Sequence, residues 1–158
     1  MQITFITIGK LQEKYLIDAV AEYKKRLTAY AKVDDVELKE TKIINEDNTT
    51  EIANALSDEG DKILSRIPDG AYVVALCVEG KGIDSMELAR IVKSAQDNTG
   101  KICFIIGSSY GLADKVKQRA DFKLSLSKLT YPHQLARVML YESVYRSMTI
   151  ITGKRYHK

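Results

Sequence analysis

The chain has 158 residues, of which 45% are hydrophobic and 28% are charged, an ordinary composition for one globular domain. A chain of this length buries roughly 70% of its unfolded surface, so it needs no disulfide or metal to fold. Its longest stretch without a charged residue, 102–113, has 12 residues, whereas a membrane-spanning helix requires ~20. These features exclude a membrane protein, a disulfide-rich miniprotein and a disordered tail. The opening MQITFITIGK is expected to be a strand rather than a signal peptide.

The two cysteines, Cys77 and Cys103, lie in separate apolar runs. Neither belongs to a CxxC pair, and no His/Cys cluster has the spacing of zinc ligands. We therefore expect two free thiols, a reducing cytoplasmic location and no metal.

Positive charge is concentrated in the last quarter of the chain. Residues 121–158 carry seven Lys or Arg against two acidic residues, whereas residues 33–120 carry eleven against sixteen. This asymmetry favours a surface that faces a polyanion. Ordinary solvated lysines would explain the charge equally well.

Strand and helix patterns alternate along the whole chain. Runs rich in β-branched and aromatic residues predict strands, and apolar residues spaced three or four apart predict helices. In chain order the predicted elements are a strand at 3–8, a helix at 14–31, an edge strand at 33–38, a helix from about 50 to 66, a strand at 72–78, a helix at 86–96, a strand at 102–106, a short helix at 114–119, a strand at 122–126 and a helix from 132 to about 148. This order predicts one α/β domain over 1–158, with a mainly parallel sheet covered by helices on both faces.

Capping residues indicate where three of these helices begin. Thr49 or Thr50 is expected to cap the second helix, and Asp84 or Ser85 the third. Pro132 suits the first position of the last helix, because its missing N–H would have no partner there.

The last predicted helix is apolar on nearly every side, with only a narrow polar line of Arg137, Glu142 and Arg146. Such a helix must be covered on two sides. The sheet covers one side, and we infer that a second copy of the chain covers the other, which predicts a homodimer. The alternative is a central helix buried within one subunit.

Three segments of unusual composition follow predicted strands, at 76–80, 107–111 and 126–131. In open parallel sheets, ligands bind beyond the carboxyl ends of the strands. Glycine lets backbone groups approach a ligand without a Cβ in the way. The GSSYG at 107–111 matches neither a dinucleotide-binding nor a Walker loop, so pyrophosphate binding is not indicated. Each segment alone is more simply a turn, and the EGKG at 79–82 is expected to end its strand; together they favour a small-molecule pocket.

Motifs of hydrolases and metalloproteases are missing, because the chain has no GxSxG and no HExxH. Its two histidines, His133 and His157, cannot form a triad of metal ligands. For His133, at the start of the last helix, a local hydrogen bond is the simpler role. The tail at 153–158 combines Arg, Tyr, His and two Lys, which suits contact with RNA as well as a solvated basic end.

Several segments together resemble one family of methyltransferases. They are ITFITIGKLQEKY, VEGKG, FIIGSSYG, LSLSKLTYPHQLARVMLYESVYR and the terminal YHK. They resemble the bacterial ribosomal RNA large-subunit methyltransferase H family, the smallest type of SPOUT, or α/β-knot, methyltransferase. The resemblance covers essentially the whole chain, and the LSKLTYPHQLARV block and YHK are its most specific parts. One departure is Ser108, which stands where the family usually has a second glycine, whereas Gly107 is kept.

The resemblance implies a homodimer, a C-terminal deep trefoil knot and S-adenosylmethionine bound in that knot. It places the cofactor contacts at Leu76, Gly107, Leu126, Ser127, Lys128, Leu129, Thr130 and Tyr131. It further implies methyl transfer to N3 of a pseudouridine in a 23S ribosomal RNA stem-loop at the ribosomal subunit interface. A chain this small has few contacts to offer, so we expect the assembled ribosome to be the substrate.

The resemblance also places the C-terminal tail at the active site, either in its own subunit or completing the pocket of the partner subunit. We assign His157 as the base that removes the N3 proton and Tyr156 as a stacking or hydrogen-bonding partner of the target base. Arg155, Lys158 and Lys154 are expected to bind RNA phosphates. The main rival is a non-catalytic ribosome- or RNA-binding module with a vestigial cofactor pocket. A flavodoxin-like nucleotide binder is the second rival, and the missing phosphate loop disfavours it.

Overall fold

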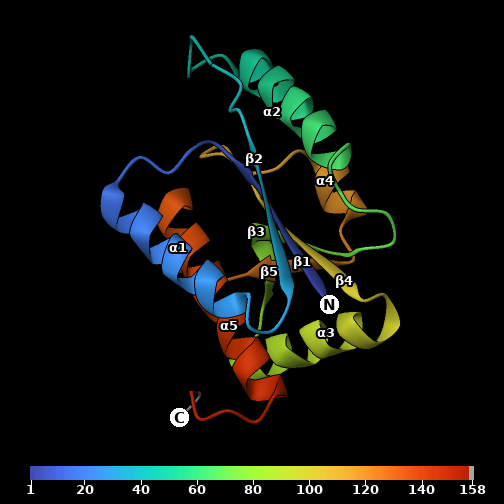
Figure 1. The fold of residues 1–158 in the computed structure, drawn as a ribbon. Coiled ribbons are helices and arrows are strands. Elements are labelled where there is room, and N and C mark those ends of the chain that lie inside the picture. The colour runs from blue at the N-terminus through green and yellow to red at the C-terminus, as the bar shows by residue number, and fades with distance from the viewer. Residues whose placement is uncertain (157–158) are drawn as a thin grey trace.

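The computed structural model describes residues 1–156. In chain order its elements are β1 (Gln2–Ile8), α1 (Lys14–Leu27), β2 (Lys32–Leu38), α2 (Thr49–Leu64), β3 (Tyr72–Gly82), α3 (Ser85–Asn98), β4 (Lys101–Ile106), α4 (Asp114–Arg119), β5 (Phe122–Ser125) and α5 (His133–Ile151). The five strands are parallel and form one sheet in the order β2-β1-β4-β3-β5 (Figure 1). The predicted α/β fold with a parallel sheet, and with β2 at an edge, is confirmed.

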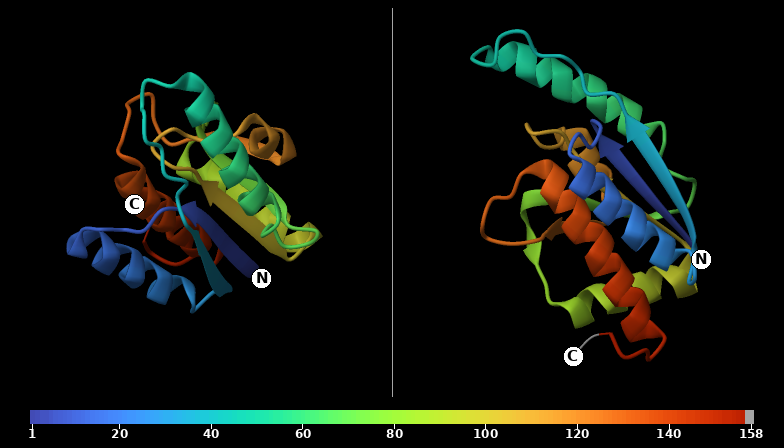
Figure 2. Two further views of the ribbon diagram at one scale, coloured as in Figure 1. Left: turned by 90° about the horizontal axis from the view of Figure 1, so that it is seen from above. Right: turned by 60° about the vertical axis from the view of Figure 1, so that its left-hand side comes forward.

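Helices cover both faces of the sheet. Helices α1, α3 and α5 lie on one face and α2 and α4 on the other (Figures 1 and 2). Successive residues of a strand point to opposite faces, and in β1 Ile3 and Phe5 join the core under α1, α3 and α5, whereas Ile6 and Ile8 join the core under α2 and α4. The sheet is therefore buried on both sides, as its nearly continuous apolar strands predict.

Two helix ends differ from the predictions. Helix α1 ends at Leu27 with Thr28 as its C-cap, four residues before the predicted end. Helix α2 is capped by Asn48, whose side chain accepts a hydrogen bond from the Thr50 N–H at 3.1 Å, and not by Thr49 or Thr50. Asn caps a helix as well as Thr does, so the sequence of this loop is consistent with several start positions for α2.

Of the other two predicted caps, one is confirmed and one is shifted by one residue. Asp84 caps α3 and accepts a hydrogen bond from the Glu87 N–H at 2.7 Å, which confirms this prediction. Pro132 is the N-cap of α5 rather than its first helical residue. The helix continues to Ile151, and Gly153, with φ of +67°, follows it in the left-handed conformation that often ends helices.

Strand β3 does not end at the EGKG segment, contrary to the prediction. Leu76 and Lys81 both lie opposite Leu124 of β5, so residues 77–80 form a bulge and the strand resumes beyond them. A Cβ added to Gly80 would lie 2.6 Å from the carbonyl carbon of Leu124. Only glycine permits this approach of one backbone to another.

Helix α5 packs largely within one chain. It lies between α1 and α3 and against the sheet, where the ring of Tyr141 stacks on Phe5 with centroids 3.8 Å apart. Arg137, on the predicted polar line, is 7% exposed and forms an ion pair of 3.2 Å with Glu37 of β2. Leu135 stays 38% exposed, so the cover of α5 by a second copy of the chain stays a prediction.

We expect Gly80→Ala to lower the free energy of unfolding by about 1–3 kcal/mol, because the new methyl group must displace the backbone of β5. Urea unfolding followed by circular dichroism would measure this change. Gly82→Ala is the matched control: nothing lies within 4 Å of an added Cβ there, so its effect should stay within about 0.5 kcal/mol. Equal effects of the two substitutions would contradict the proposed packing of Gly80.

Candidate functional site

The structure brings the three predicted loop segments to one edge of the sheet. The segments 107–111 and 126–131 follow β4 and β5, and 76–80 forms the bulge of β3, which lies between these two strands. The three strands are parallel, so their carboxyl ends point the same way. Adjacent strands lie about 4.8 Å apart, so the segments 76–80, 107–111 and 126–131 begin within about 10 Å of one another. This edge is where open parallel sheets bind ligands.

The first segment, 76–80, is held against its neighbours. The Glu79 carboxylate forms an ion pair with Lys117 of α4, which holds the pKa of Glu79 below its usual range. Gly80 lies against the backbone of β5. Leu76, at the start of the segment, is half-buried and packs against the core. The segment thus has a fixed position beside β5 and leaves one apolar side chain at the strand end.

The second segment, 107–111, is a tight turn that closes on itself. A Cβ on Gly107 would lie 2.1 Å from the carbonyl oxygen of Gly111, and Gly111 has φ of +89°. The Gly111 N–H donates to the Ser108 carbonyl at 2.9 Å. Glycine is therefore needed at position 107 because the backbone of Gly111 lies so close to it. The sequence instead predicted that glycine lets a ligand approach the backbone.

Glu59 of α2, which the sequence analysis missed, forms a hydrogen bond with this turn. The Ser108 hydroxyl, buried in the structure, donates to the Glu59 carboxylate of α2 at 3.0 Å. Glu59 is itself only 3% exposed, and this burial raises its pKa. The signal was present, since Ala55, Glu59 and Ile63 are spaced by four residues and so share the buried face of α2.

The third segment, 126–131, connects β5 to α5. Leu126 is half-buried against the core, whereas Leu129 is 70% exposed. The Ser125 hydroxyl donates to the carbonyl of Ser127 at 3.0 Å, and the Ser127 hydroxyl accepts from the Leu129 N–H at 2.9 Å. These local bonds shape the turn between β5 and α5.

The tail lies at the opposite end of α5 from these segments. Helix α5 has 19 residues and is about 28 Å long. The segment 126–131 precedes it, and Tyr156 comes after it. A single chain therefore does not bring Tyr156 to the three segments, although the sequence analysis assigned both to one site.

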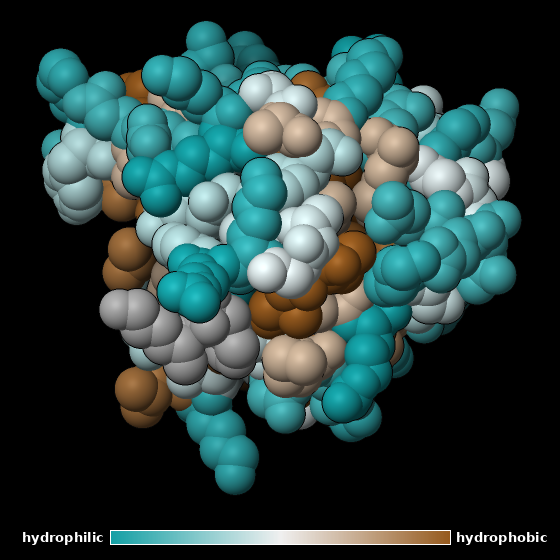
Figure 3. Space-filling model, turned by 60° about the horizontal axis from the view of Figure 1, so that its bottom comes forward, coloured by the Kyte–Doolittle hydropathy of each residue, from teal (hydrophilic) through white to brown (hydrophobic). Residues whose placement is uncertain are grey.

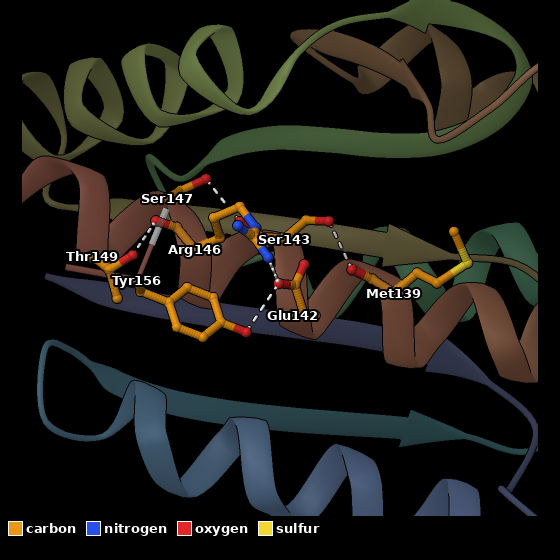
Figure 4. Close-up of polar contacts among 7 residues, drawn as sticks. All are labelled: Met139, Glu142, Ser143, Arg146, Ser147, Thr149 and Tyr156. Atoms are coloured by element: carbon orange, nitrogen blue, oxygen red, sulfur yellow. Dashed lines mark hydrogen bonds and ion pairs between the residues drawn. The ribbon is translucent and has the colours of Figure 1, made fainter. Parts of the chain in front are cut away.

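Tyr156 folds back on the last turns of α5 (Figure 4). Its hydroxyl donates to Glu142 at 3.2 Å, and its ring meets Tyr145 edge-on with centroids 4.9 Å apart. The guanidinium of Arg146, which also binds Glu142 at 2.6 Å, lies 4.8 Å from the centre of the Tyr156 ring. Burial, followed by hydrogen bonding with Tyr23, raises the pKa of Tyr156 to about 12. The phenol is therefore neutral and a hydrogen-bond donor at physiological pH.

The other predicted tail residues are placed in part. The Lys154 ammonium lies 4.7 Å from the centre of the Tyr30 ring, a cation–π contact, and Arg155 is exposed. His157 and Lys158, which we assigned to the proton transfer and to phosphate binding, lie outside the described residues.

Two hollows lie away from the three segments. A groove of about 460 Å³ between α3 and α5 is lined by Met86, Ala89, Arg90, Lys93, Ser94, Asp97, Asn98, Ile150 and Ile151. Figure 3 views this end of the molecule and shows hydrophobic side chains surrounded by hydrophilic ones. A second hollow, at the carboxyl end of β1 beside His133 and Arg137, has about 10 Å³, room for roughly one water molecule. Neither hollow coincides with the predicted cofactor residues.

Over residues 1–156, no group of His, Cys, Asp and Glu has the arrangement of a metal site, and no helix is both long and apolar enough to span a membrane. Both cysteines are free thiols, as predicted. Burial raises the pKa of Cys103 to about 12, so this thiol is unreactive.

Comparisons with known proteins identify the family to which the chain belongs. The model of a family described as "Predicted SPOUT methyltransferase" matches residues 1–157. The ribosomal RNA large subunit methyltransferase H of Bacillus pumilus is 48% identical, and that of Clostridioides difficile 42%, each over the full length of both chains. A crystal structure of a probable methyltransferase from Bordetella pertussis shares the fold, with a TM-score of 0.56 and 12% identity over 92% of this chain and 93% of that one. The chain therefore belongs to the SPOUT methyltransferase family, among the relatives of ribosomal RNA large subunit methyltransferase H.

Proposed function

We propose that this protein transfers a methyl group from S-adenosylmethionine to N3 of a pseudouridine in 23S ribosomal RNA. The observation that carries the proposal is the similarity, over the full length of both chains, to relatives named ribosomal RNA large subunit methyltransferase H. The gathering of three loop segments at the carboxyl edge of the sheet supports it, because this edge offers a place for the methyl donor.

The residues at this edge fit such a donor. Leu76, just before the bulge of β3, and Leu126, just after β5, are half-buried apolar side chains on neighbouring strands, suited to the faces of an adenine ring. Backbone groups of 127–131, where 128–130 are exposed, together with Gly107, would bind its polar edges. When bound, the sulfonium compound supplies an electrophilic methyl group, so the chain needs only to align the attacking nitrogen and exclude water. The trefoil knot implied by the family is part of this proposal, and the packing of 77–80 over β5 supports it.

The tail would supply the remaining chemistry. N3 of pseudouridine carries a proton and becomes a nucleophile when that proton leaves. We assign this proton transfer to His157. Tyr156 is a neutral phenol at physiological pH, and its pKa, raised to about 12, makes its phenolate form still rarer, so it would donate a hydrogen bond or stack on the base rather than accept the proton. Lys154, Arg155 and Lys158 would bind phosphates and stabilise the developing negative charge.

We propose a homodimer, and the position of the tail supports it beside the apolar character of α5. Helix α5 carries the segment 126–131 at one end and the tail at the other, about 28 Å apart. A two-fold axis across α5 would pair the helix with its copy in antiparallel fashion. The tail of each subunit would then reach the loop segments of its partner, which completes two sites per dimer.

The function is tested by the nucleosides of ribosomal RNA from a strain that lacks the gene. Mass spectrometry should show the loss of one methylpseudouridine, and the purified protein should restore it on ribosomes far better than on naked stem-loop RNA. Calorimetry should show micromolar binding of S-adenosylmethionine. An unchanged modification pattern together with no donor binding would favour the non-catalytic RNA-binding module.

We expect His157→Ala to lower kcat by about 10²–10⁴-fold, the usual contribution of a general base. The Kd for S-adenosylmethionine should stay within about twofold, because His157 acts on the base and not on the donor. Single-turnover methylation and calorimetry measure the two quantities. Equal losses of turnover and donor affinity would refute the assigned role.

A mixed dimer tests the shared site. Thr130→Arg places a large cation at an exposed position of the donor segment and should abolish donor binding without unfolding the chain. We expect each of Thr130→Arg and His157→Ala to be nearly inactive as a homodimer. Equal co-expression of the two should restore about a quarter of the wild-type activity, since half of the dimers would hold one intact site. No restoration would show that each site uses the tail of its own chain.

A further inference from the structure

We propose that Glu59 is a positioning residue for the methyl-donor site, acting through Ser108 on the turn 107–111. The inference rests on the proposed function, since it takes this turn as part of the donor site. Glu59 lies on α2, on the face of the sheet away from α5, and would touch neither donor nor RNA.

The hydrogen bonds of Glu59 join three parts of the chain. One carboxylate oxygen accepts from the Ser108 hydroxyl at 3.0 Å. The other accepts from the backbone N–H of Thr41, in the connection between β2 and α2, at 2.9 Å. Glu59 and Ser108 are 3% and 6% exposed, so solvent does not compete for these bonds. The carboxylate thus fixes the turn 107–111 to a helix and to a loop that are distant in sequence.

The surroundings of Glu59 make this link specific. A buried carboxylate is costly unless its oxygens accept hydrogen bonds, and bonds to a charged acceptor are stronger than neutral ones. The nearby charges are Glu40, which raises the pKa of Glu59, and Lys62, which lowers it. Within residues 1–156 neither forms an ion pair with Glu59, so the two neutral donors carry much of its stabilisation.

The side chain of Ser108 supplies the link between the turn and α2. A glycine there has no side chain to donate, so the bond to Glu59 exists because residue 108 is serine. The turn already closes through the Gly111 N–H and the Ser108 carbonyl. The bond to Glu59 adds an anchor from outside the turn. A turn fixed before binding loses less conformational entropy when the ligand arrives, which raises affinity.

Two single variants and their combination test the link. Ser108→Ala removes the hydroxyl, and Glu59→Gln keeps the size of the side chain and removes its charge. We expect Ser108→Ala to raise the Kd and KM for S-adenosylmethionine about tenfold, and Glu59→Gln about threefold, with kcat within twofold of wild type. The double variant should be no weaker than Ser108→Ala, because without the hydroxyl no hydrogen bond to residue 59 is left to weaken.

Asp58→Asn is the matched control. Asp58 is the neighbour of Glu59 on α2 and accepts from the Thr41 hydroxyl and Lys62, both at 2.6 Å, but does not contact the turn. This variant should leave the donor KM unchanged. An equal rise in KM with Asp58→Asn, or additive effects of the two test substitutions, would overturn the proposal and indicate a general loss of stability.

Hydrogen exchange of the protein without donor separates this inference from the proposed function. Ser108→Ala should speed amide exchange in 107–111 about tenfold and leave β4 unchanged. Wild-type protein that fails to bind S-adenosylmethionine would refute the proposed function, while the exchange result still tests the anchor. Unchanged exchange in 107–111 would refute the anchor even if the donor binds.

Discussion

The parallel pairing of β4, β3 and β5 is the constraint on which the site depends. It brings the segments 76–80, 107–111 and 126–131, which are distant in sequence, to one edge of the sheet. The bulge at 77–80 also holds β3 and β5 together, because it folds over β5 with the two backbones in direct contact at Gly80. If β5 paired at any other place, the segment 126–131 would not lie at this edge of the sheet, and α5 would begin at a different position.

Helix α5 then sets how the parts of the site relate to one another. It is anchored on the sheet by the Phe5–Tyr141 stack and on β2 by the buried ion pair of Arg137 with Glu37. These contacts hold its direction, so its length separates the donor segments from Tyr156. This separation is the reason for proposing that the site is shared between the two chains of a dimer.

The sequence predicted every strand and helix, because their apolar periodicities are local. It failed where burial depends on partners far along the chain. Arg137 is buried against Glu37, one hundred positions earlier in the chain, and no local pattern records that pair. The spacing of Glu59 on α2 indicates its burial, but its partner Ser108 belongs to another element, so the link between them is not visible in the sequence. The trefoil knot, the donor and the target nucleotide came from family resemblance alone.

The glycines show why such a site resists derivation from composition. Gly80 and Gly107 were singled out because glycine admits a ligand close to the backbone. In the folded chain each admits another part of the same chain instead, β5 in one case and Gly111 in the other. Both requirements select the same residue type, so a glycine-rich loop at a strand end is equally consistent with internal packing and with binding. What distinguishes a site is how its loops are held, and Glu59 beneath Ser108 is a contact of that kind. A turn needed only for chain reversal would gain little from a buried carboxylate, whereas a turn that must meet a ligand in one fixed shape gains affinity from it.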